Sequence, residues 1–128
     1  MKIISSSIFS SFNNLGKNAI HPSEFALYHD KQHEDKRFRI EKFTEDLELT
    51  WFETTDLTNG NETWLPAQFI YLPFNQDKQY ITANTSTGLA AHTNYYKAIL
   101  TALYEVIERD SFVITWMQEI VSEKIIKI

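Results

Sequence analysis

The sequence predicts an α+β fold in which an antiparallel β-hairpin packs against a long C-terminal helix. Two runs rich in β-branched and aromatic residues, 49–55 and 63–72, flank the dipeptide Asn59-Gly60, the strongest short-range signal of a hairpin. After Gly88 the sequence contains neither glycine nor proline, and apolar residues recur at helical spacing. With 128 residues, the chain has the length of one domain.

The N-terminal part of the chain carries weaker signals. The first 20 residues are polar and rich in Ser and Asn, and we expect a poorly defined segment that precedes a domain over residues 21–128. Pro22 predicts the start of a short helix through Tyr28, because a first helical turn tolerates the missing N–H of proline. The highly charged stretch 31–42 is expected to be a solvated loop or a helical turn.

Two further positions shape the predicted hairpin and helix. Pro66 lies inside the second β-run, and a proline there requires an edge strand or a bulge because it has no N–H for the ladder. The helix is predicted over residues 93–116, either as one unbroken helix or as two segments separated near Asp110 and Ser111.

Composition and charge exclude several classes of function. The net charge of −5 argues against a general nucleic-acid binder and against electrostatic docking to a membrane, since both need a basic surface. No run of 18 apolar residues is present, so we expect no membrane span. The absence of cysteine excludes disulfides, thiolate nucleophiles and cysteine-based zinc sites. We expect a cytoplasmic protein.

Glu105 and Glu108 are one turn apart on the predicted helix, on the same face as Lys97, so both carboxylates can reach one cation. Magnesium at nucleotide sites is usually held by one or two carboxylates, with water and phosphate oxygens completing its shell. The pair is therefore a candidate metal site. The alternative is an ordinary charged helix face, on which Glu105 and Arg109 form an i,i+4 ion pair.

The segment Thr-Ser-Thr-Gly at 85–88 comes just before the predicted helix. Hydroxyls, a glycine and free N–H groups at a helix start attract phosphate, because the helix dipole and the unpaired donors point toward it. The segment matches neither GxxxxGK nor GxGxxG. The alternative is a polar turn that caps the helix.

Three histidines are weaker candidates. His29 and His33 are four residues apart, a spacing compatible with metal binding, but they lie in a charged stretch where solvated side chains are the simpler expectation. His92 lies at the junction of loop and helix, where it either contacts phosphate or caps the helix.

Taken together, the turn and the acidic helix resemble the YcaO family, and within it the SagD-like cyclodehydratases that form thiazole and oxazole rings in ribosomally made peptides. The resemblance rests on order and spacing and extends from about Leu15 to Trp116. The segments that carry it are 85–91 and 105–112, supported by 21–25, 57–60, 65–67 and 98–100.

The resemblance implies a partial YcaO-like domain and ATP-dependent chemistry on a peptide backbone. In such enzymes a side-chain thiol or hydroxyl attacks the preceding amide carbon, and ATP phosphorylates the amide oxygen so that an azoline ring can form. Matched position by position, Glu105 and Glu108 would bind Mg²⁺, Arg109 would contact the nucleotide, and Ser86 would lie near the phosphates. The implied partners are a precursor peptide, as in bacteriocin biosynthesis, and a leader-binding, E1-like maturation protein.

The chain also departs from the family pattern. Lys97 replaces an acid, so either metal binding fails or its ammonium meets phosphate directly. His92 replaces a glycine of the turn. The family's earlier acidic ATP motif and the long stretch that follows Trp116 have no counterpart in these 128 residues.

Three functions therefore remain open. The first is a fragment of a cyclodehydratase that is inactive alone. The second is a non-catalytic interaction module that docks on a precursor peptide or a maturation partner. The third is an unrelated small α+β ligand-binding domain.

Overall fold

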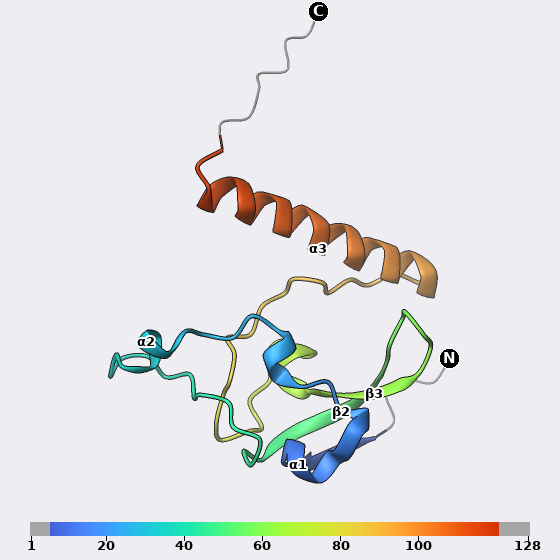
Figure 1. Cartoon of the computed structure of the whole chain (residues 1–128). Coiled ribbons are helices and arrows are strands. Elements are labelled where there is room, and N and C mark those ends of the chain that lie inside the picture. Colours follow the sequence, from blue (N-terminus) through green and yellow to red (C-terminus); the bar gives the residue numbers. More distant parts are fainter. Residues whose placement is uncertain (1–5, 121–128) are drawn as a thin grey trace, which may run out of the picture. The chain divides into compact units, whose positions relative to one another are not determined.

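The computed structural model describes residues 6–120 of the chain. They divide into two compact units, unit 1 up to Thr85 and unit 2 from Ser86 onward. The predicted α+β class is confirmed, because unit 1 contains a three-stranded antiparallel sheet and unit 2 a long helix (Figure 1). Packing of the hairpin on the helix stays a prediction, since the two elements belong to different units.

The sheet of unit 1 has the order β1-β2-β3 and is antiparallel throughout. Its strands are β1 (Ser7–Ser10), β2 (Leu49–Thr55) and β3 (Glu62–Pro66). The predicted hairpin is confirmed, with β2 paired to β3 from Trp51 opposite Pro66 to Thr55 opposite Glu62. Pro66 is the last residue of an edge strand, one of the two positions that its missing N–H allows.

The loop of the hairpin is closed by both backbone and side chain of Asp56. Its carbonyl accepts the Gly60 N–H at 2.8 Å, and its own N–H donates to the carbonyl of Asn61 at 2.8 Å. The carboxylate accepts the Thr58 N–H at 2.8 Å and the Asn59 amide at 2.7 Å. The bond from Thr58 is the main cause of a lowered pKa of Asp56, and the bond from Asn59 adds to it, because both favour the ionised carboxylate.

The first 20 residues contain elements that the sequence analysis does not assign. After β1 come a one-turn helix, α1 (Phe12–Leu15), and a 3₁₀ turn (Gly16–Asn18). The strand has little pattern of its own, and it forms because β2 supplies hydrogen-bonding partners along its whole length. The predicted division of the chain at residue 20 stays a prediction.

The short helix predicted from Pro22 to Tyr28 is wrong. Only Pro22–Glu24 turn, as a 3₁₀ helix, and Phe25 is already extended, with φ −93° and ψ 145°. The ring of Phe25 stacks on that of Phe69, with centroids 4.4 Å apart, so a tertiary contact outweighs local helix preference. The charged stretch that follows overlaps α2 (Asp30–His33), a single helical turn of the kind predicted there.

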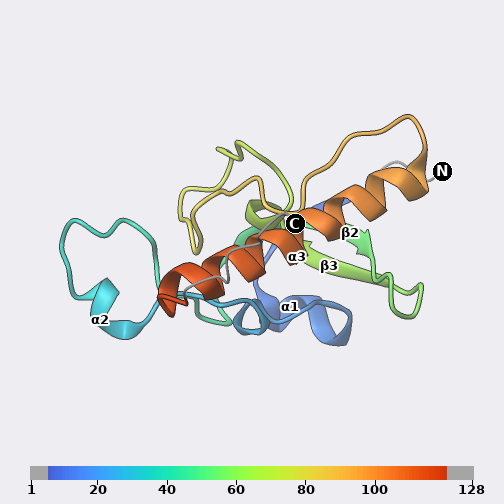
Figure 2. The same cartoon turned by 90° about the horizontal axis from the view of Figure 1, so that it is seen from above.

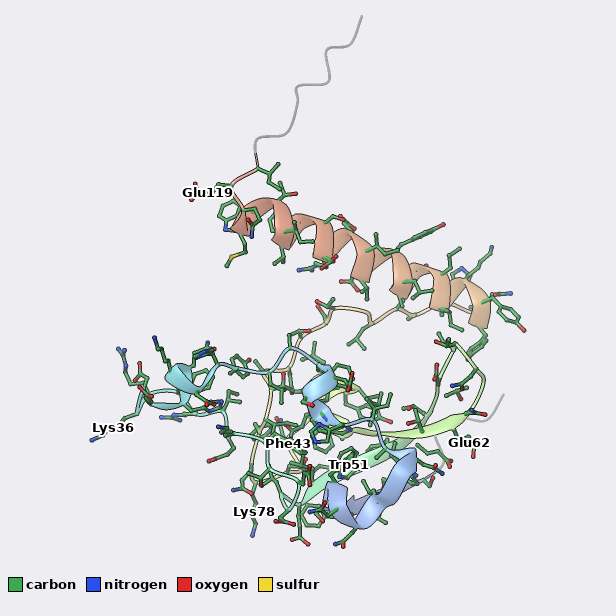
Figure 3. The ribbon with its side chains drawn as sticks, viewed as in Figure 1. Lys36, Phe43, Trp51, Glu62, Lys78 and Glu119 are labelled. Atoms are coloured by element: carbon green, nitrogen blue, oxygen red, sulfur yellow. The ribbon has the colours of Figure 1, made fainter. Side chains whose placement is uncertain are left out.

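The core of unit 1 is formed by Leu49, Trp51 and Ile81, each at most 1% exposed. The indole N–H of Trp51 donates to the carbonyl of Ser10 at 2.9 Å, which ties the core to β1. Partly buried side chains surround this cluster: Phe12, Leu15, Ala19, Phe43, Leu47, Trp64 and Phe69. Figure 3 labels Trp51 and Phe43 among the side chains of this unit.

A buried polar network links the loop after β3 to the centre of the sheet. The Asp77 carboxylate accepts the N–H and hydroxyl of Thr50 at 3.1 and 2.6 Å, and the amide of Gln68 at 3.0 Å. The Gln68 side chain also donates to the Gln79 carbonyl at 2.8 Å and accepts the Ile81 N–H at 2.9 Å. A chain segment without regular structure is thereby fixed against β2. A 3₁₀ turn (Ala67–Phe69) carries Gln68.

Unit 2 consists of a turn, a short extended segment and α3 (Tyr95–Met117). The helix is unbroken (Figure 2), so of the two predicted arrangements the single helix is the one observed. Its N-cap is Asn94, whose side chain accepts the Lys97 N–H at 3.1 Å. No residue of α3 is buried. Among the described residues, no helix combines the length and the apolar character that crossing a membrane requires.

Candidate functional site

The residues that the sequence analysis singles out for the site all lie in unit 2. Ser86 lies in the turn that begins the unit, whereas the other four lie on α3: Lys97, Glu105, Glu108 and Arg109. The two segments can therefore be assessed together within one compact unit.

The turn has the form of a type II turn from Ser86 to Leu89. The carbonyl of Ser86 accepts the N–H of Leu89 at 3.0 Å, and Gly88, the third residue, has φ +81°. Thr87 has no positive φ, which distinguishes this turn from its mirror image. A Cβ atom on Gly88 would lie 3.2 Å from Cγ2 of Val106 on α3. The turn therefore needs glycine both for its backbone angle and for its close approach to the helix.

Glu105 connects the helix to this turn. Its Oε2 accepts the N–H of Gly88 at 3.0 Å, across 17 residues of sequence. Its Oε1 lies 3.7 Å from Nη2 of Arg109, and the side chain of Glu105 is only 26% exposed. The i,i+4 ion pair of the alternative interpretation is thus present, but such a pair stabilises an exposed helix by only about 0.3–0.5 kcal/mol. The carboxylate has a second partner that an ordinary charged helix face does not provide.

Glu108 is exposed and its carboxylate has no hydrogen bond or ion pair within residues 86–120. It lies three positions after Glu105, a spacing that places both residues on the same side of α3. A carboxylate offers about four lone-pair positions, so Glu105 retains acceptor capacity beside its bond to Gly88. The pair fits Mg²⁺ as a partial donor set, because this ion keeps several waters and often takes only one or two protein carboxylates.

The pair does not belong to a larger ligand cluster. Across residues 6–120, His, Asp and Glu nowhere form a group of three or more that could hold a metal ion. A cation at Glu105 and Glu108 would therefore draw its other oxygens from water or from phosphate.

Ser86 and Lys97 are both exposed, and neither side chain has a partner within residues 86–120. The hydroxyl of Ser86 and the N–H groups of Ser86 and Thr87 are thus free to donate, whereas the N–H of Gly88 is occupied by Glu105. Lys97 lies eight residues before Glu105, which corresponds to about 12 Å along the axis of α3. This separation keeps the Lys97 ammonium from pairing directly with the carboxylates, and its contact with phosphate stays a prediction.

The histidines have structural partners. Nδ1 of His29 accepts the N–H of Lys31 at 3.2 Å and so caps α2, while Nδ1 of His33 lies 3.1 Å from the carbonyl of Ile40. Nδ1 of His92 accepts the N–H of Asn94 at 2.9 Å, one residue before α3 begins. Of the two readings of His92, the structure shows the local capping bond.

Sequence reasoning missed the contact between Gly88 and Glu105. The sequence indicates the turn and the acidic face separately, and nothing in their spacing indicates that a backbone N–H of one would bind a carboxylate of the other. The only available signal is the glycine itself, because a positive φ beside a helix requires one.

Comparison with known proteins gives a family and a fold. A protein-family model described as "YcaO cyclodehydratase, ATP-ad Mg2+-binding" matches residues 4–127. A solved structure titled "Structure of the heterocyclase TruD" is similar with a TM-score of 0.71 and 24% identity, over 86% of this chain and 18% of that one. A second solved structure, titled "Heterocyclase in complex with substrate and Cofactor", is similar with a TM-score of 0.75 and 21% identity, over 85% of this chain and 16% of that one.

At these identities the two structures establish a shared fold. The chain spans less than a fifth of the length of either one. No curated protein sequence matches it.

Proposed function

The chain belongs to the YcaO cyclodehydratase family, and from this premise we propose that it carries part of the nucleotide site of an ATP-dependent, azoline-forming enzyme. The substrate class is a ribosomally made precursor peptide, whose Cys, Ser or Thr side chains would close thiazoline or oxazoline rings. Such an enzyme would work in the cytoplasm, where precursor peptides are synthesised.

One observation carries the proposal: the N–H of Gly88 donates to the carboxylate of Glu105. This bond brings the hydroxyl-rich turn and the acidic face of α3 together, although nothing in an ordinary amphipathic helix requires it. A phosphate-binding turn beside a pair of carboxylates is the combination that a magnesium–nucleotide complex needs, because the metal must touch both protein oxygens and phosphate oxygens.

Each residue then has a distinct role. Glu105 and Glu108 would hold Mg²⁺, while the Ser86 hydroxyl and the free N–H groups of the turn would contact phosphate. Arg109, already oriented by Glu105, would place its guanidinium against the nucleotide. Bound ATP would supply the phosphoryl group that turns an amide oxygen into a leaving group.

We further propose that the chain is inactive alone. Two carboxylates are a small donor set, and no third acidic or histidine ligand joins them within residues 6–120. Lys97 adds a positive charge on the same face, which favours phosphate and disfavours metal. Turnover would therefore require further ligands from a maturation partner.

A second candidate function is supported by the surface of α3. Its apolar side chains are exposed, among them Tyr96 at 79%, Trp116 at 72% and Ile107 at 62%. Near its C-terminal end, Phe112 and Trp116 line a surface hollow together with Ile120. A large exposed apolar surface is typical of a docking site, so the chain could act as a non-catalytic module that binds a precursor peptide or an E1-like partner.

The test of the first function is calorimetric titration of the folded protein with magnesium–ATP. We expect weak binding that becomes several-fold tighter in Lys97→Glu, because the exchange removes a positive charge and adds a negative one on the helix face that carries the two carboxylates. Lys78→Glu makes the same charge change in unit 1 and should have no effect. If neither the native protein nor Lys97→Glu releases or absorbs heat on titration, the nucleotide site is excluded.

The variant Glu105→Gln distinguishes the docking function from the nucleotide-binding function. This variant should lose magnesium–ATP binding, but a docking module would still retain an immobilised leader peptide or partner protein. Loss of both interactions together would contradict docking on the apolar surface.

A further inference from the structure

Glu105 is held at both of its oxygens by groups that differ in kind. A backbone N–H bonded to an ionised carboxylate is a charge-assisted hydrogen bond, stronger and more directional than a neutral one. The bond from Gly88 to Oε2 is 3.0 Å long, whereas Arg109 approaches Oε1 only to 3.7 Å. The orientation of this side chain therefore depends more on Gly88 than on its ion pair.

The neighbouring acid lacks any such support. Glu108 is exposed and has no partner within residues 86–120, so no contact in that range fixes its rotamer. The two members of the acidic pair are thus unequal, with one fixed and one free. A ligand that is oriented in advance binds a cation at lower entropic cost, and hydrogen-bonding groups behind metal ligands typically change affinity by about 10- to 100-fold.

The conformation in which Gly88 donates this bond favours glycine. Its φ of +81° is a conformation that other residues adopt at an energetic cost, and a Cβ atom would press against Cγ2 of Val106 at 3.2 Å. The same contact with α3 that demands glycine also brings its N–H within reach of Glu105. Backbone angle, close approach and hydrogen bond are therefore a single arrangement.

We infer that Gly88 is a positioning residue, whose backbone N–H orients Glu105 to bind a divalent cation while Glu108 remains free to adjust. The inference rests on the proposed magnesium site but makes a separate claim about the contact itself. The N–H groups of the turn then have different partners. The N–H of Gly88 donates to the carboxylate of Glu105, which leaves the N–H groups of Ser86 and Thr87 available to donate to phosphate.

The contact is tested first without any ligand, by NMR of the Gly88 amide in the full chain. Glu105→Ala should shift this resonance strongly, because it removes the acceptor, whereas Glu108→Ala should leave it nearly unchanged. An amide that responds equally to both variants, or to neither, would overturn the inference. This result is decisive whether or not the protein binds metal, so it is distinguishable from a failure of the proposed function.

The consequence for binding is tested with Mg²⁺ alone, by calorimetry on Gly88→Ala. We expect an affinity about tenfold weaker than in the native protein. Leu89→Ala, which truncates the next side chain of the same turn, is the matched control and should bind normally. An unchanged affinity in Gly88→Ala, with the helical circular dichroism signal intact and the residue 88 amide no longer responding to Glu105→Ala, would overturn the positioning role.

If Gly88 has a purely structural role, Gly88→Ala should lose the helical circular dichroism signal without any selective loss of Mg²⁺ affinity. If Gly88→Ala disturbs the helix, the double variant with Val106→Ala removes the overlap with the new methyl group. Because alanine keeps the backbone N–H, the double variant is also examined by NMR of the residue 88 amide. Mg²⁺ affinity that recovers together with the response of this amide to Glu105→Ala supports positioning, whereas affinity that recovers while the amide no longer responds shows that Gly88 acts only through packing.

Discussion

One tryptophan of unit 1 and the tryptophan of unit 2 lie in opposite environments. In unit 1 Trp51 is 0% exposed and forms the centre of the core, whereas in unit 2 Trp116 is 72% exposed at the end of a helix without any buried residue. Burial of apolar surface is the main driving force of folding, so unit 1 has its own source of stability. The helix of unit 2 relies on its N-cap, on intrinsic propensity and on the contact between Gly88 and Glu105.

The candidate site and the buried core lie in different units. All residues of the candidate site lie in the unit that buries least, which is consistent with binding sites being drawn from the less stable parts of proteins. An isolated helix is at best marginally stable in water, since its formation requires a costly nucleus. A single well-placed hydrogen bond therefore matters more in unit 2 than it would in unit 1.

The largest effect is expected from truncating the core tryptophan. Trp51→Ala should destabilise the protein by about 3–5 kcal/mol, because it removes a fully buried aromatic side chain and leaves a cavity. The hydrogen bond from its indole to Ser10 is lost as well, which frees β1. Urea unfolding followed by circular dichroism measures the change.

Trp116→Ala is the matched comparison, since it deletes the same side chain at an exposed position. It should alter the free energy of unfolding by no more than about 0.5 kcal/mol. A loss comparable with that of Trp51→Ala would mean that α3 has a buried face in solution, and the contrast between the two units would fail.

The polar network of unit 1 should show the next largest effect. Asp77→Ala is expected to cost about 1–3 kcal/mol, because it removes the acceptor of the half-buried Thr50 donors and one of the two acceptors of the buried Gln68 amide. Asp77→Asn keeps one acceptor oxygen and should cost less. Asp46→Ala, which removes an exposed bond to Asn13, is the control and should be nearly neutral in the same unfolding experiment. Equal losses in Asp77→Ala and Asp46→Ala would contradict a special role for the buried network.

Much of the fold could be predicted because its signals are local. The hairpin follows from β-rich runs around Asn59 and Gly60, and the unbroken α3 follows from the absence of glycine and proline after Gly88. By contrast, β1 depends on pairing with a strand 40 residues away along the chain, and the extended Phe25 depends on stacking against Phe69. Contacts of this kind leave no periodicity in the local sequence.

Less can be said of the candidate site. Spacing alone places Glu105 and Glu108 on one side of a predicted helix, and α3 contains both positions. It does not distinguish the two acids, because their difference arises from a backbone donor 17 residues earlier. Only the folded structure shows which carboxylate accepts a backbone hydrogen bond and which does not.

The smallest effect concerns the hairpin loop, where unit 1 uses the same device as unit 2, a carboxylate held by backbone N–H. The pKa of Asp56 lies below its ordinary value of 3.8, chiefly because the N–H of Thr58 bonds to its ionised form. A lowered pKa means that the stabilisation is present above the pKa of the unfolded chain and is lost as the pH falls through the lower, folded value. NMR titration of the Asp56 carboxyl carbon should show a midpoint below 3.8.

Two variants rank the donors of this loop. Thr58→Pro removes the main donor and should return the midpoint most of the way to its ordinary value. Asn59→Ala removes a side-chain donor to Asp56, together with the acceptor of the Asn61 N–H, and should shift the midpoint less. If Asn59→Ala has the larger effect, the backbone N–H is not the principal cause. Backbone donors would then be poor orienting groups for exposed carboxylates in this protein, and the role assigned to Gly88 in unit 2 would lose its counterpart in unit 1.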